Sequence, residues 1–89
     1  MGNYIGGSAF AMTQQVAEGF TLVTERTFRR LSRGELDALG RQIEKSLREI
    51  RSEQPPLDDT LAIQKRNRRI QRLNTCRMML STFRQRQRI

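Results

Sequence analysis

Residues 31–50 read LSRGELDALGRQIEKSLREI, and this stretch decides the fold of the chain. Ser32 and Glu35 are spaced as a capping box, in which each side chain binds the backbone amide of the other residue. Leu31 and Leu36 are placed to form the hydrophobic staple that accompanies such a helix start. Two local signals therefore predict a helix that begins at residue 33.

The apolar residues of this stretch recur every three or four positions, so they share one face of the helix. That face consists of Leu36, Leu39, Ile43, Leu47 and Ile50. On the outside, two acids each precede a base by four residues, which is the favourable order for an ion pair along a helix. These expected pairs are Asp37 with Arg41 and Glu44 with Arg48.

Two consecutive prolines, Pro55 and Pro56, end this helix. A proline cannot donate the helical amide, and the residue before it is pushed out of the helical region. We therefore expect a helix over about 33–53 and a short turn after it. Asp58 or Asp59 then caps a second helix, because a carboxylate at that position satisfies free amides and favours the helix dipole.

The second helix is expected over about 60–86, a range without Gly or Pro. Its apolar band comprises Ala62, Ile63, Ile70, Leu73, Cys76, Leu80 and Phe83. Met78 and Met79 fall outside this band and predict a second apolar surface near the end of the helix. We expect Cys76 to be buried as a small hydrophobic residue.

These elements predict an all-α fold, an antiparallel two-helix hairpin of about 33–53 and 60–86. Two helices alone leave part of their apolar stripes facing water. We therefore expect a homodimer in which two hairpins form a four-helix bundle, with docking on the helices of another protein as the alternative.

The hairpin domain is expected to span residues 19–89, after a flexible leader at 1–18. Residues 1–11, MGNYIGGSAFA, are rich in Gly, uncharged and similar to a vector-derived linker. Residues 20–24, FTLVT, have the composition of a strand. Such a strand would pair across a dimer or with a partner protein, or else the segment would remain a loop.

The net charge of +8 arises from 17 Lys and Arg against 9 Asp and Glu, and it is unevenly spread. Residues 1–25 carry two acids and no base, and residues 26–59 carry eight bases and seven acids. Residues 60–89 carry nine bases and no acid, so the excess lies on the second helix. Most of the bases are Arg, whose planar guanidinium suits phosphate or carboxylate groups.

The candidate binding residues follow from this bias. They are Lys65, Arg66, Arg68, Arg69, Arg72, Arg84, Arg86 and Arg88. Arg66 and Arg69 fall within the apolar band, so they need carboxylate partners or must extend to its rim. Glu49 and Glu53 reach the same end of the hairpin, and pairing with them would explain both arginines without any binding function.

The first functional hypothesis is a non-enzymatic interaction or assembly module whose Arg-rich helix docks an acidic protein. The alternative is a regulatory protein that uses the same face to bind DNA or RNA, with guanidinium groups on phosphates and Asn or Gln on bases. Acidic proteins, nucleic acids and anionic lipids all attract such a helix, so the charge pattern does not choose between them.

Catalysis is not indicated by any pattern in the sequence. The chain has no His and one Cys, so the commonest general base and the usual zinc ligands are missing. No Gly-rich phosphate loop and no nucleophile beside a base can be recognised. We expect no enzyme activity, no cofactor, no small-molecule substrate and no transmembrane segment, and a cytoplasmic location.

Overall fold

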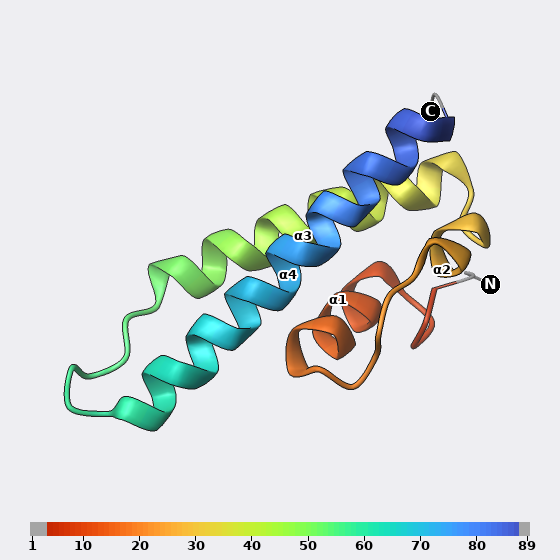
Figure 1. Ribbon diagram of the computed structural model, residues 1–89. Helices are drawn as coiled ribbons and strands as arrows, with labels where there is room; N and C mark the ends of the chain where they lie inside the picture. The colour runs from red at the N-terminus through yellow and green to blue at the C-terminus, as the bar shows by residue number, and fades with distance from the viewer. Residues whose placement is uncertain (1–3, 88–89) are drawn as a thin grey trace.

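The computed structural model describes residues 4–87, which form four α-helices and no strand (Figure 1). The helices are α1 (Ala9–Glu18), α2 (Glu25–Arg29), α3 (Arg33–Ser52) and α4 (Thr60–Gln87). Helices α1, α3 and α4 contact one another, and α2 packs against α4. The expected all-α class is confirmed.

Helix α3 begins where the sequence predicts. The amide of Glu35 donates to Ser32 Oγ at 3.1 Å, and the amide of Ser32 donates to Glu35 Oε1 at 2.8 Å. All five residues of the predicted apolar face are buried, and Leu39 and Ile43 are wholly inaccessible to water. The capping box and the apolar face of this helix are therefore confirmed.

Helix α4 begins after Asp59, whose Oδ1 accepts a hydrogen bond from the Ala62 amide at 3.0 Å. It runs back alongside α3 in the opposite direction (Figure 1). Its buried residues are Leu73, Cys76, Leu80 and Phe83. No helix of residues 4–87 is long and apolar enough to cross a membrane.

Ile63 and Ile70 are only half-buried, although the sequence places them in the core. Both lie in the N-terminal half of α4. That half and the end of α3 project together beyond α1, as Figure 1 shows. Fewer side chains are available to cover them there, so burial decreases toward the α3–α4 turn.

Residues 9–18, expected to belong to a flexible leader, form helix α1. Ser8 Oγ accepts from the Ala11 amide at 3.0 Å, and Gly19 ends the helix in the left-handed conformation with φ of 80°. The buried residues of α1 are Met12, Thr13, Val16 and Ala17. The structure therefore places this segment in the core and not in a leader outside it.

Helix α1 adds a third packed helix to the two-helix hairpin expected from the sequence. It contacts both α3 and α4 along the side that two helices alone would leave open. Part of the apolar area that was assigned to a dimer seam is thus covered within one chain, while Ile63 and Ile70 stay half-buried. The core also includes Phe28 of α2, whose ring centroid lies 5.6 Å from that of Phe83.

Residues 20–24 form no strand, so of the alternatives that the sequence left open the loop is confirmed. The segment is an irregular connection between α1 and α2. Val23 is buried while Leu22 is 88% exposed, so these two neighbouring side chains do point to opposite sides, as in a strand. A strand also needs a neighbouring strand for its backbone hydrogen bonds, and residues 4–87 provide none.

Candidate functional site

The basic residues of α4 are divided between two flanks of the helix. On one flank Arg66 reaches the C-terminal end of α3. Its Nε donates to the carbonyl oxygens of Ile50 at 3.2 Å and Glu53 at 3.0 Å, and its Nη2 donates to that of Arg51 at 3.2 Å. Carbonyl groups at a helix end lack helical partners, so a guanidinium there is favourable. Arg66 thus caps α3.

Two further arginines on this flank pair with acids of α3. Arg77 Nη1 lies 3.3 Å from Glu44 Oε1, and Arg84 Nη2 lies 2.5 Å from Asp37 Oδ1. The pairs Asp37–Arg41 and Glu44–Arg48 expected along α3 are therefore wrong. Both acids turn toward α4, which lies beside them.

On the other flank, three arginines reach α1 and α2. Arg69 Nε lies 3.4 Å from Glu18 Oε1, and Arg72 Nη1 donates to the Ala17 carbonyl oxygen at 3.1 Å. Arg86 Nη1 lies 3.7 Å from Glu25 Oε2. Arg72 acts on the end of α1 as Arg66 acts on the end of α3.

Arg66 and Arg69 do make internal contacts, but not with the carboxylates of Glu49 and Glu53 that the sequence indicated. Arg66 binds backbone oxygens, including that of Glu53, and Arg69 pairs with Glu18 of α1. The sequence could not indicate Glu18 as a partner, because the segment that carries it was not expected to pack on α4.

The internal contacts leave few of the candidate residues available to a partner. Within residues 4–87, only Lys65 and Arg68 of the candidates form no ion pair or hydrogen bond through their side chains. Arg88 lies outside the described residues. The structure therefore does not gather the candidate residues into one open basic surface on α4.

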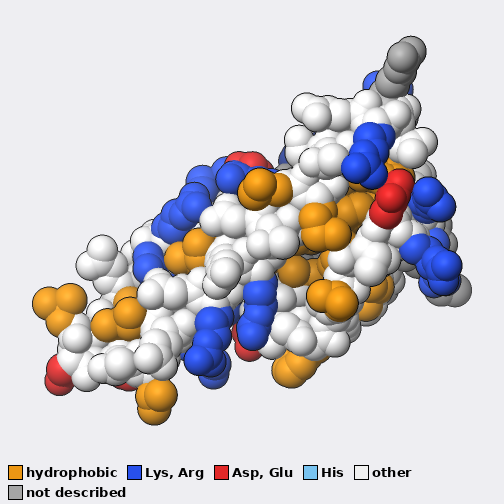
Figure 2. Space-filling view, in the orientation of Figure 1, with side chains coloured by type: hydrophobic (Ala, Val, Ile, Leu, Met, Phe, Trp, Pro, Cys, Tyr) orange, Lys and Arg blue, Asp and Glu red, His pale blue; other side chains and the backbone are white. Residues whose placement is uncertain are grey.

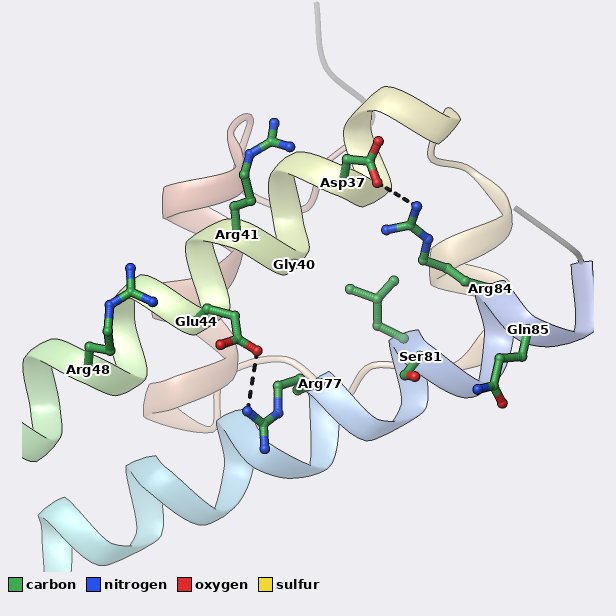
Figure 3. Close-up of a pocket in the computed structure, with 10 residues that line it drawn as sticks. Asp37, Gly40, Arg41, Glu44, Arg48, Arg77, Ser81, Arg84 and Gln85 are labelled. Carbon is green, nitrogen blue, oxygen red and sulfur yellow. Dashed lines mark hydrogen bonds and ion pairs between the residues drawn. The ribbon is translucent and has the colours of Figure 1, made fainter.

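A groove of about 860 Å³ lies between α3 and α4 (Figure 3). Gly40 and Leu80 are among the residues that line it. A Cβ atom on Gly40 would lie 3.6 Å from Leu80 Cδ2, so the backbone of α3 comes close to α4 here. The polar lining is Asp37, Arg41, Glu44, Arg48, Arg77, Ser81, Arg84 and Gln85.

The charges of this groove are unequally compensated. Asp37 and Glu44 are matched by Arg84 and Arg77 across the groove, as the dashed lines in Figure 3 show. Arg41 and Arg48 lie along the same helix and point away from these pairs (Figure 3). Neither forms an ion pair or hydrogen bond through its side chain in the described part of the chain.

Lys45 extends these two residues into a row, which we call the α3 basic stripe (Arg41, Lys45 and Arg48). The three residues are spaced by four and three positions, so they share the side of α3 opposite its buried face. All three are exposed, and within residues 4–87 Lys45 also has no polar side-chain partner.

The sequence contains the signal for this stripe, because three bases recur at helical spacing opposite the apolar face. The functional prediction was placed on α4 because that helix carries the larger excess of positive charge. Arg41 and Arg48 were expected to pair with acids of α3, so the sequence did not indicate that they are free to bind a partner.

Cys76 is the one thiol of the chain and is 3% exposed. Burial raises the pKa of this thiol to about 11, so the reactive thiolate is scarce at neutral pH. Among residues 4–87, no three His, Cys, Asp or Glu side chains gather as metal ligands.

The polar groups of the α3–α4 groove are suited to binding charged groups.

Comparison with known protein families, with curated proteins and with solved structures finds no match to this chain.

Proposed function

We propose that this chain is a non-enzymatic helical interaction module that binds an acidic segment of a partner protein. The binding surface is the α3 basic stripe together with the adjoining α3–α4 groove. The observation that carries the proposal is the pairing of Asp37 and Glu44 with arginines of α4. This pairing leaves Arg41 and Arg48 without internal partners within residues 4–87, and Lys45 between them has none there either.

The proposal moves the binding surface from the second helix to α3. The arginines of α4 act indirectly, because Arg77 and Arg84 hold the acids of α3 that would otherwise neutralise Arg41 and Arg48. An arginine that is free of internal contacts keeps its planar donor groups for the carboxylates of a partner.

An acidic protein segment suits this surface better than nucleic acid does. None of the described residues that line the groove is aromatic, so they offer no ring on which a base could stack. From Arg41 to Arg48 the helix rises only about 10 Å, which limits the stripe to a few charged contacts.

The proposal is tested by fluorescence anisotropy with a labelled poly-glutamate peptide as the probe. The test variant combines Arg41→Gln, Lys45→Gln and Arg48→Gln. The matched control combines Arg26→Gln, Arg30→Gln and Arg33→Gln, which removes the same charge from three other exposed residues without polar side-chain partners within residues 4–87. Both variants leave the buried core unchanged.

We expect the test variant to bind poly-glutamate roughly 10- to 100-fold more weakly, which corresponds to up to about 1 kcal/mol for each lost contact. The control variant is expected to lose at most about threefold in affinity for poly-glutamate, because its long-range attraction is weaker. Equal losses in the two variants would contradict a site on α3.

Random duplex DNA and single-stranded RNA are titrated in parallel to decide the class of partner. Tighter binding of either nucleic acid than of poly-glutamate, with a steep loss of affinity as salt rises, would replace the proposal with the nucleic-acid hypothesis. Failure of all three probes to bind at low salt would overturn both.

A further inference from the structure

Helix α1 covers only one side of the pair formed by α3 and α4. On that side, Thr13 and Ala17 of α1 lie with Ser46 and Ile50 of α3 around a small polar cavity. The α3–α4 groove has no residue of α1 in its lining and lies on the other side of the pair. Figure 2 shows basic side chains gathered along the α3 edge of the molecule, away from α1. The groove is therefore an open position beside two helices, comparable to the one that α1 fills.

Gly40 lies in the interior of α3, where glycine is the least favourable residue apart from proline. An alanine Cβ at this position would lie 3.6 Å from Leu80 Cδ2, which is an ordinary contact distance. The backbone of Gly40 has no positive φ, so its conformation does not require glycine either. The fold of the chain itself therefore does not need a glycine here. A glycine on the surface of a groove does allow the backbone of a bound molecule to come close.

The charges of the groove define where a bound segment must carry its acids. Four arginines and two acids line the groove, an excess of two positive charges. The two acids are paired with Arg77 and Arg84, so the excess lies on Arg41 and Arg48. These two residues are seven positions apart, which is about 10 Å along α3. Glu44 lies between them, so an acid of the partner at that level would be repelled.

We propose that the acidic segment bound here is an α-helix that packs in the α3–α4 groove and carries two acidic residues seven positions apart. In a helix such residues share one face and are about 10 Å apart, which matches Arg41 and Arg48. An extended strand rises about 3.3 Å per residue and would span this distance in three positions, but its side chains would then point to opposite sides. A small residue of the partner helix lies against Gly40.

This inference rests on the proposed function, because the same groove and the α3 basic stripe bind the segment. It adds the conformation of the partner and the spacing of its acids. The bound helix and α1 then enclose the α3–α4 pair from its two sides.

Two labelled peptides of about 20 residues test the spacing of the acids. Both consist of Ala and Gln with two Glu, and circular dichroism checks that both are equally helical. The two Glu are seven positions apart in the first peptide and five positions apart in the second, which sets them on different sides of the helix. By fluorescence anisotropy we expect the first to bind about fivefold more tightly, which corresponds to one charged contact of about 1 kcal/mol. Equal affinities, or no binding of either peptide, would overturn the helical partner.

The variant Gly40→Gln tests the groove separately from the α3 basic stripe. Its long uncharged side chain occupies the space beside Leu80 and leaves the stripe unchanged. The matched control is Gly34→Gln on the same helix, because a Cβ on Gly34 meets nothing within 4 Å and Gly34 does not line the groove. We expect Gly40→Gln to weaken binding of the first peptide at least about tenfold and Gly34→Gln to change it by no more than about twofold. Equal effects of the two substitutions would overturn the placement of the partner helix over Gly40.

Poly-glutamate distinguishes a failure of this inference from a failure of the proposed function. Its like charges keep it disordered at neutral pH, so it contacts the stripe without filling the groove, and we expect Gly40→Gln to bind it as the unmodified chain does. If poly-glutamate binding depends on the stripe but the two helical peptides bind equally, only the helical partner is overturned. If poly-glutamate binding does not depend on the stripe, the proposed function fails, and this inference fails with it.

Discussion

Met12 provides the strictest test of the role of α1. Its side chain is 0% exposed and lies in the core of α1, α3 and α4. Replacing a fully buried Met with Ala destabilises a protein by about 2–5 kcal/mol, against a total stability of about 5–15 kcal/mol for a typical domain. For a domain of this size each kcal/mol lowers Tm by about 4–8 °C. We therefore expect Met12→Ala to lower Tm by at least about 10 °C, measured by far-ultraviolet circular dichroism.

The control for this prediction is Phe10→Ala on the same helix. Phe10 is 56% exposed, so removing its larger side chain is expected to change the stability by no more than about 0.5 kcal/mol. A Met12→Ala protein that unfolds at the same temperature as Phe10→Ala would refute the packing of α1 on the other helices. The segment would then be a leader, as the sequence suggested.

Three further predictions follow from local geometry. Gly40→Ala is expected to raise the stability by about 1 kcal/mol, since Ala favours the helix interior and its Cβ would meet Leu80 at an ordinary distance. Gly19→Ala is expected to lower the stability by about 1–2 kcal/mol, because the backbone is left-handed there and the new Cβ would lie 2.8 Å from the Arg72 guanidinium. Equal Tm changes in the two variants would contradict these helix assignments. Ser32→Ala removes the cap of α3 and is expected to cost about 1 kcal/mol in chemical denaturation, and no change would mean that the capping box is not formed in solution. Cys76 should react slowly with iodoacetamide at neutral pH in the folded chain and rapidly in urea. Because its pKa is raised to about 11 from 9.0, its contribution to stability is full below pH 9 and is lost as the pH rises toward 11. Fast alkylation of the folded chain at pH 7 would contradict the burial of this thiol.

The parts of the fold that rest on neighbouring residues could be predicted from the sequence. Ser32 and Glu35 are three residues apart, and the apolar face of α3 repeats without interruption, so both the start and the buried face of α3 were correct. Asp59 caps α4 on a similar local signal, a carboxylate directly before an uninterrupted helical stretch.

Helix α1 could not be predicted in this way because its short apolar face is buried only by distant elements. Met12 and Val16 have helical spacing, but the segment has no charged residue on its other side before Glu18 to mark a solvent-facing surface. The Gly residues before it and the absence of charge resemble a linker. Its burial depends on the surface that α3 and α4 together create.

The distribution of charges could be predicted only in part. Asp37 has a possible partner four residues later in the same helix, Arg41, and another in the second helix, Arg84, and the sequence alone indicates the nearer one. The structure selects the distant partner because α4 lies beside α3 at this level. This choice changes which arginines are available, and it moves the candidate site from α4 to α3.

In the proposed function the arginines of this chain have two roles: those of α4 hold the helices together, and those of α3 bind the partner. Arginine Nε–Hε signals in nuclear magnetic resonance spectra test it most directly, during titration with poly-glutamate. The predicted result is that Arg41 and Arg48 shift as the peptide is added, while Arg66 and Arg72, which bind carbonyl oxygens of α3 and α1, stay unchanged. Shifts of Arg66 and Arg72 without shifts of Arg41 and Arg48 would contradict this division of roles.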